Sequence, residues 1–108
     1  MQNHAKVVII GGGVVGCSIL YHLSKFGMKD CILLERNELT SGSSWHAAGN
    51  VHVISNDPNI SRMMAYTIGL YKEIEKESGH SVGFKPSGGF YLASNEVWAE
   101  YLKRERSK

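Results

Sequence analysis

The sequence predicts an α/β fold built on parallel strands, and three observations support this class. The apolar, β-branched run Lys6–Ile10 leads directly into the glycine-rich segment Gly11–Gly16. A helical pattern of apolar residues follows, and a second apolar run, Cys31–Leu34, comes after it. A strand, a helix and a strand within about 30 residues are typical of a parallel crossover unit.

The spacing of apolar residues assigns each element of this unit. Lys6–Ile10 (KVVII) is short and continuous, which is typical of a strand buried on both faces. From Gly13 onward, apolar residues recur three and four positions apart, which predicts a helix that extends to Phe26. Gly27 is expected to provide a left-handed C-terminal cap. Cys31–Leu34 (CILL) is then predicted to be the second buried strand.

Residues 37–50 (NELTSGSSWHAAGN) are rich in serine and glycine and lack a clear period. They predict a loop with one helical turn near Ser44–Ala48. Val51–Ile54 is expected to form a short strand.

The remaining residues predict two further helices and a strand. The first helix is expected over residues 57–78, because an Asp-Pro pair begins it and an apolar stripe follows. Gly79 ends it. Phe90–Ala93 (FYLA) predicts a strand, and Ser94 or Asn95 is expected to cap a final, strongly charged helix.

The composition is that of an ordinary globular protein, with 43% hydrophobic and 20% charged residues. A net charge of +2 does not point to nucleic acid or to an anionic membrane. No run approaches the ~20 apolar residues that span a bilayer. Without a secretory signal or room for a presequence before the first strand, a cytoplasmic location is expected. Cys17 and Cys31 are expected to be buried rather than joined in a disulfide.

Gly11, Gly13 and Gly16 match the G-x-G-x-x-G fingerprint of dinucleotide-binding domains. The first glycine makes the tight turn, the second lets the backbone approach a diphosphate, and the third lets the helix pack closely on the sheet. Amides at the helix start, including those of Val14 and Val15, would face the diphosphate at the positive end of the helix dipole. The context predicts a Rossmann-like domain.

Glu35 follows Gly16 by 19 residues, close to the ~20 expected of the acid that binds the adenosine ribose. Its carboxylate would accept hydrogen bonds from both ribose hydroxyls and repel the 2′-phosphate of NADP, although Arg36 beside it weakens that second inference. The alternative is a glycine-rich turn in an unrelated α/β domain, with Glu35 at a solvated strand end. The fingerprint does not distinguish FAD from NAD, because both contain ADP.

The loop that follows Glu35 and Arg36 carries a resemblance. Leu39–Gly49 (LTSGSSWHAAG) resembles the corresponding segment of the dimethylglycine and sarcosine dehydrogenase family, flavoenzymes of the D-amino-acid-oxidase superfamily. Three further segments also resemble members of this family: Glu75–Gly79, Val82–Phe84 and Gly88–Asn95. The resemblance therefore covers nearly the whole chain, and the loop motif is more specific than the glycine fingerprint.

The resemblance implies FAD as the cofactor, with His46 bonded through a ring nitrogen to the 8α-methyl carbon of the flavin. A neutral imidazole is a competent nucleophile. Ser43, Ser44 and Trp45 are expected to contact the cofactor beside it, although Trp45 could instead fill core. Spacing alone favours the alternative, a loop histidine that bonds to the backbone, with FAD held noncovalently. The resemblance of the loop to the family favours the covalent link.

The resemblance also implies a larger architecture, in which FAD-binding and substrate-binding segments are interleaved along a longer chain. Residues 1–56 would form the FAD-binding unit and attachment loop, and residues 57–108 the first, incomplete elements of the substrate side. We therefore expect the 108 residues alone to be poorly stable and inactive.

The activity implied by the resemblance is hydride transfer from an N-methylated glycine, dimethylglycine or sarcosine, to the flavin. Electrons would pass to an electron-transfer flavoprotein or to oxygen, and tetrahydrofolate would bind in a C-terminal domain outside this chain. No residue is identified as catalytic, and no metal site is expected because the histidines share no ligand spacing.

Three alternatives remain open at this point. One is an amine or amino-acid oxidase of the same superfamily with noncovalent FAD. Another is an NAD- or ADP-binding module without flavin chemistry, which leaves Ser41–Gly49 unexplained. The third is a nonfunctional remnant of a gene.

Overall fold

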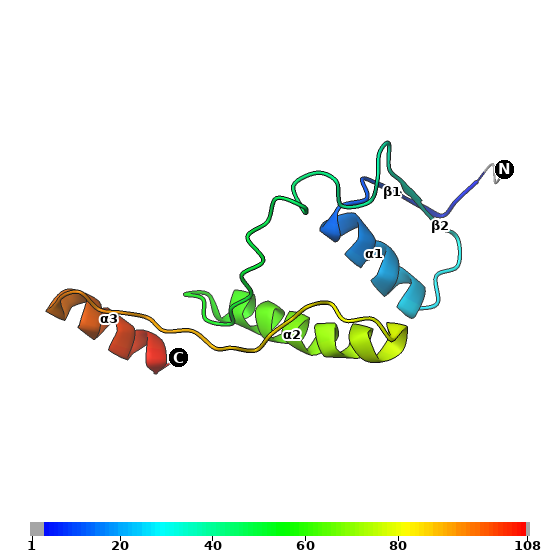
Figure 1. Ribbon diagram of the computed structural model, residues 1–108. Helices are drawn as coiled ribbons and strands as arrows, with labels where there is room; N and C mark the ends of the chain where they lie inside the picture. The colour runs from blue at the N-terminus through cyan, green and yellow to red at the C-terminus, as the bar shows by residue number, and fades with distance from the viewer. Residues whose placement is uncertain (1–3, 108) are drawn as a thin grey trace. The chain divides into compact units, whose positions relative to one another are not determined.

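The computed structural model describes residues 4–107, so residues 1–3 and 108 lie outside the described part. The chain divides into two compact units between Asn50 and Val51. In the described residues, the first unit holds the strand β1 (Val7–Ile10), the helix α1 (Val14–Lys25) and the strand β2 (Cys31–Leu34), and the second holds the helices α2 (Pro58–Ser78) and α3 (Glu96–Arg106) (Figure 1). The functional division between residues 56 and 57 stays a prediction.

The first unit is a parallel strand–helix–strand arrangement, as the sequence predicts. β1 and β2 pair in parallel, with Val7 opposite Cys31 and Ile10 opposite Leu34. Helix α1 connects the strands and packs against both of them. The helix closes as expected, because Gly27 has a φ of 82° and its N–H donates to the carbonyl of Ser24.

Burial within the first unit is lower than the sequence predicts. Among the described residues, Ile9 is the buried hydrophobic side chain, at 7% exposure, whereas Val8 and Ile10 remain 50% and 86% exposed. The expectation that β1 is buried on both faces is therefore wrong. The expectation that β2 is a buried strand is also wrong, since Leu34 is 53% exposed. Cys17 and Cys31 are free thiols, and both are half-buried rather than buried. The physical reason is that, among residues 4–50, α1 is the one helix packed on the sheet.

In the second unit, both helices begin at residues that cap them. The Asp57 carboxylate accepts hydrogen bonds from the amides of Asn59 and Ile60 at the start of α2. At the other end, Gly79 has a φ of 70°, which confirms the predicted stop. Of the two residues expected to cap the final helix, Asn95 does so.

Two predicted strands are absent from the described residues. Neither Val51–Ile54 nor Phe90–Ala93 forms a strand, and Phe90 and Leu92 are 96% and 90% exposed. A strand requires a neighbouring strand to pair its backbone, and the described residues of the second unit provide none. The low burial of apolar side chains favours the prediction that the 108 residues alone are poorly stable. In the described part of the chain, no helix combines the length and apolar character that crossing a membrane requires.

Candidate functional site

The candidate site begins at the phosphate loop, which we define as Gly11–Gly16, between β1 and α1. Gly11 has a φ of 105°, a conformation that favours glycine, and its N–H donates to the carbonyl of Leu34 at 2.8 Å. A Cβ atom on Gly16 would overlap the Gly11 carbonyl oxygen. Two of the predicted glycines are thus required for the chain to turn from the strand directly into the helix.

The start of α1 is left open by its own sequence. The Cys17 amide donates to the Gly13 carbonyl at 3.0 Å, so the amides of Val14, Val15 and Gly16 precede the first bond within the helix. Gly13 is the N-cap and has no side chain, and the first turn contains no acidic residue. The positive end of the helix dipole is therefore available to an anion such as a diphosphate.

A hydroxyl from a distant segment reaches this helix start. The Val14 N–H donates to Ser44 Oγ at 2.8 Å, although the two residues lie 30 positions apart. A Cβ atom on Gly13 would lie 3.2 Å from the same oxygen, so the absence of a side chain at Gly13 leaves room for the contact. The sequence placed Ser44 near the cofactor but did not predict this contact.

The Glu35 side chain is hydrogen-bonded to the phosphate loop. Its Oε2 accepts the Gly12 N–H at 2.7 Å, and its Oε1 accepts the Asn37 N–H at 2.9 Å. The hydrogen bonds from Gly12 and Asn37, in that order, hold the pKa of the Glu35 carboxyl below its ordinary value, with smaller help from Arg36 and against a weaker effect of desolvation. An ionised carboxylate has about four lone-pair sites, so it can also accept ribose hydroxyls. Gly12 has no place in the fingerprint, and only its position in a run of three glycines could have indicated it.

The attachment loop, defined here as residues 39–47, is built from hydrogen-bonded turns over residues 39–46. The Thr40 N–H donates to the Gly12 carbonyl at 2.8 Å, and the Trp45 N–H donates to the Thr40 carbonyl at 3.0 Å. Thr40 has a φ of 65°, which is uncommon for a residue with a branched side chain. The turn therefore begins earlier than the single turn predicted near Ser44–Ala48.

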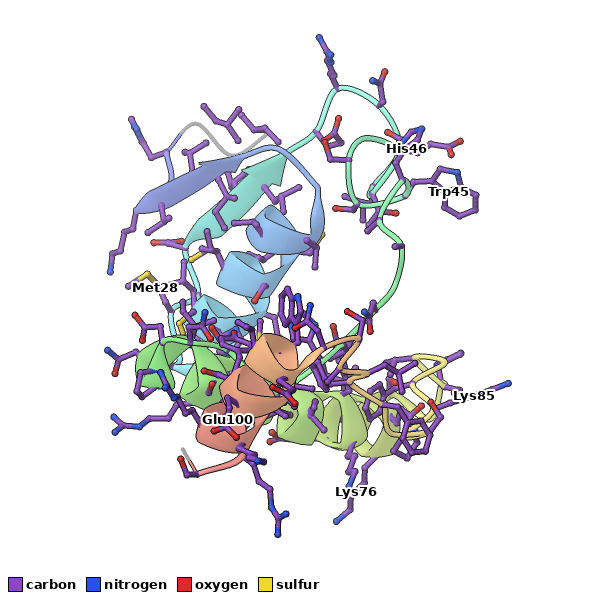
Figure 2. The ribbon with its side chains drawn as sticks, turned by 90° about the vertical axis from the view of Figure 1, so that its left-hand side faces the viewer. Met28, Trp45, His46, Lys76, Lys85 and Glu100 are labelled. Carbon is purple, nitrogen blue, oxygen red and sulfur yellow. The ribbon has the colours of Figure 1, made fainter. Side chains whose placement is uncertain are left out.

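A cavity of about 630 Å³ brings most of the predicted site residues together. Its lining includes Gly11, Gly13, Val14, Val15, Gly16, Glu35, Arg36, Ser43 and Ser44. Trp45 and His46 are not in the lining. Figure 2 shows both on the attachment loop, and Trp45 is 78% exposed.

The His46 side chain is exposed and oriented by the loop. Its Nδ1 lies 2.9 Å from the Gly42 carbonyl oxygen. Because a carbonyl oxygen only accepts, this bond requires the proton on Nδ1 and leaves a lone pair on Nε2 of the neutral ring. In residues 4–107, no group of three or more His, Cys, Asp or Glu side chains is arranged to hold a metal ion.

Comparison with known proteins identifies the family. The sequence profile of the FAD dependent oxidoreductase (DAO) family matches residues 6–108. The chain belongs to this family. Membership of the FAD dependent oxidoreductases implies FAD rather than NAD as the cofactor, a choice that the glycine fingerprint leaves open.

The chain is similar to enzymes of N-methylated amino acids. It is 43% identical to human mitochondrial dimethylglycine dehydrogenase over 107 residues, which cover 99% of the chain and 12% of the relative. It is 42% identical to human mitochondrial sarcosine dehydrogenase over 105 residues, covering 96% and 11%. It is 40% identical to 4-methylaminobutanoate oxidase (formaldehyde-forming) of Paenarthrobacter nicotinovorans over 93 residues, covering 86% and 11%. The chain thus spans about one eighth of the length of these curated relatives.

The cytoplasmic location expected from the sequence is wrong. The human dimethylglycine and sarcosine dehydrogenases are both named as mitochondrial proteins. The expectation rested on the few residues before the glycine fingerprint, whereas the chain spans only 12% and 11% of these two relatives.

Proposed function

We propose that this oxidoreductase chain provides the diphosphate cradle and the flavin-attachment site of an enzyme that oxidises N-methylated glycines, dimethylglycine or sarcosine. The observation that carries the proposal is the hydrogen bond between Ser44 and Val14. It joins the loop that resembles the dehydrogenase family to the helix start that suits a diphosphate.

Different residues of the cavity would bind different parts of FAD. The diphosphate would bind the amides of Val15 and Gly16 at the start of α1, next to Val14, whose own N–H donates to Ser44. The adenosine ribose would bind the Glu35 carboxylate, which is ionised at neutral pH. Arg36 would lie beside it.

The substrate class follows from what the relatives' names have in common. Dimethylglycine, sarcosine and 4-methylaminobutanoate are all carboxylates with an N-methylated amine. Bound FAD would accept a hydride from the carbon next to that nitrogen. This chain would position the cofactor for the reaction.

His46 is the proposed attachment residue, through Nε2. The Gly42 carbonyl keeps the Nδ1 proton in place, so Nε2 has the lone pair needed to form a bond. In the overall reaction, a C–H bond of the 8α-methyl group would break and an Nε2–C bond would form. The proton would go to solvent, and the two electrons would pass through the flavin to molecular oxygen. Ser43 and Trp45 would contact the cofactor beside this bond.

The remaining partners belong to the whole enzyme. Residues 57–108 would begin a substrate-side domain interleaved with the FAD domain. Electrons from the substrate would leave to an electron-transfer flavoprotein or to oxygen, and tetrahydrofolate would accept the one-carbon unit in a C-terminal domain.

The experiment uses protein expressed from the complete reading frame that contains these residues. Acid-precipitated wild-type protein is expected to retain yellow flavin, and the His46→Ala variant is expected to release it. The wild-type protein is also expected to reduce an artificial dye with dimethylglycine or sarcosine. Protein that contains no FAD, or that oxidises neither amine, would contradict the proposal.

Noncovalent FAD is the second candidate, and it is favoured by the absence of His46 from the cavity lining. Under this alternative, acid would release the flavin from wild-type and His46→Ala protein alike. Amine oxidation would be retained.

A further inference from the structure

Two hydrogen bonds tie the attachment loop to the phosphate loop, one near each end. At the first, the Thr40 N–H donates to the Gly12 carbonyl, and at the second, the Val14 N–H donates to Ser44 Oγ, both at 2.8 Å. The Trp45 N–H donates back to the Thr40 carbonyl, so the turn between the two ties is closed. The loop is therefore held at two points rather than by a single hinge.

The two ties depend on the sequence in different ways. The tie at Thr40 uses backbone groups only, so most residue types could make it. The tie at Ser44 requires a side-chain hydroxyl, and Ser44 lies two positions before His46. Removing that hydroxyl would detach the end of the loop that carries the imidazole from the start of α1. The other end would stay bonded to Gly12 through Thr40.

We propose that Ser44 is a positioning residue for flavin attachment, whose hydroxyl sets the place of the His46 ring relative to the diphosphate cradle. This inference rests on the proposed function, since it concerns the rate at which the Nε2–C bond forms. The bond formation is the one given above, with proton loss from the 8α-methyl group and oxygen as the final oxidant. Ser44 accepts the hydrogen bond from the Val14 N–H in this scheme and exchanges no electrons.

The Ser44 hydroxyl fixes the position of the attachment loop relative to the start of α1. It accepts the Val14 amide, and that amide belongs to the same helix start that would hold the diphosphate. Misplacing a reacting group by about 1 Å can slow a reaction by roughly a hundredfold. Loss of one neutral hydrogen bond at a partly exposed position changes binding far less, by about 1 kcal/mol or under. The attachment rate should therefore be more sensitive to Ser44 than FAD affinity is.

The test compares Ser44→Ala, Ser44→Thr and Ser44→Val in the complete protein. Threonine and valine have nearly the same shape, but only threonine has the hydroxyl. Apoprotein from a riboflavin-starved host is mixed with FAD in air, and covalent flavin is followed by its fluorescence in denaturing gels. FAD affinity is measured separately in a His46→Ala background, where no bond can form. Ser18→Ala is the matched control, because its hydroxyl lies near His22 one turn along α1.

The attachment rate is expected to fall by roughly ten- to a hundredfold in the alanine and valine variants. Threonine is expected to restore it, and Ser18→Ala to leave it unchanged. FAD affinity in the His46→Ala background is expected to change by less than about fivefold, which corresponds to about 1 kcal/mol. Circular dichroism identifies any variant that does not fold, and the threonine–valine pair then decides the result.

Two results would overturn the inference while the proposed function stands. One is an attachment rate that does not depend on the hydroxyl. The other is an FAD affinity that falls by the same factor as the rate, which would make Ser44 a general structural residue. If wild-type protein forms no covalent flavin at all, both the Ser44 inference and the proposed attachment at His46 are wrong. The measurement on wild-type protein alone distinguishes this outcome from the other two.

Discussion

The helices α1 and α2 begin in opposite ways. At the start of α2, Asp57 uses its own carboxylate to accept the amides of Asn59 and Ile60. At the start of α1, the N-cap is Gly13, which has no side chain, and the hydroxyl that reaches Val14 comes from 30 residues away. The start of α2 is completed locally, whereas the start of α1 depends on a distant segment.

This difference separates a structural helix start from a binding one. A helix must satisfy or expose its first amides, and a local acceptor does so at no cost to the rest of the chain. A ligand can use those amides only where the local sequence leaves them open. By this criterion, the starts of α2 and α3 are structural, because Asn95 caps α3 in the same local way. The start of α1 suits a diphosphate.

The largest expected effect is that of Gly16→Ala, because a Cβ atom there would overlap the Gly11 carbonyl oxygen. The turn must then open, at a cost of about 3 kcal/mol, and the complete protein should be purified without FAD. The control is Gly69→Ala in α2, where nothing lies within 4 Å of an added Cβ atom. This control should retain FAD and stabilise the helix by about 0.5–1 kcal/mol. Equal FAD content in the two variants would contradict the comparison.

Glu35→Gln is expected to have the next largest effect, because it removes the charge that accepts the Gly12 N–H. FAD affinity at neutral pH should fall several-fold, measured by quenching of flavin fluorescence. Glu38→Gln is the matched control, since it removes a nearby charge and leaves the Gly12 contact intact.

The same substitution predicts a change in the dependence of stability on pH. Because the pKa of Glu35 is lowered in the folded protein, its ionised form stabilises the fold above the ordinary pKa of glutamate, ~4.3. That contribution is lost as the pH falls through the lowered pKa. The thermal unfolding midpoint of wild-type protein should therefore fall more steeply in acid than that of Glu35→Gln. If the midpoints of the two proteins change in parallel with pH, the hydrogen bonds of the Glu35 carboxylate do not contribute to stability.

Asp57→Ala should have a smaller, purely structural effect. Loss of this cap costs about 1 kcal/mol, and the amides of Asn59 and Ile60 should exchange their hydrogens faster. FAD affinity should stay unchanged. A large loss of FAD would show that the start of α2 is not merely structural.

The smallest effect is expected at the ion pair between Lys103 and Glu100 in α3, whose side chains are 72% and 60% exposed. Lys103→Ala should change the free energy of unfolding by less than about 0.5 kcal/mol. Chemical denaturation with and without added salt measures this. A larger, salt-dependent loss would show that local contacts in the second unit matter more than the comparison implies.

Features of the fold that depend on neighbouring residues were predicted more accurately than features that depend on distant residues. The helix ends at Gly27, Gly79 and Asn95 were correctly predicted, because caps depend on neighbouring residues. The strand at Phe90–Ala93 was wrongly predicted, because its apolar composition does not show whether another strand lies beside it. Burial of β1 was overestimated for a similar reason, since burial depends on the layers around a strand.

The candidate site divides in the same way. From the sequence came the glycine turn, the acid after β2 and a serine-rich loop with a histidine, since each is a pattern of residue types at set spacing. Only the tertiary structure paired Ser44 with Val14 and Glu35 with Gly12. Those contacts join residues 30 and 23 positions apart, and the path of the chain between them decides whether two groups meet. Residue types determine what each group can bind, whereas folding determines which group it finds.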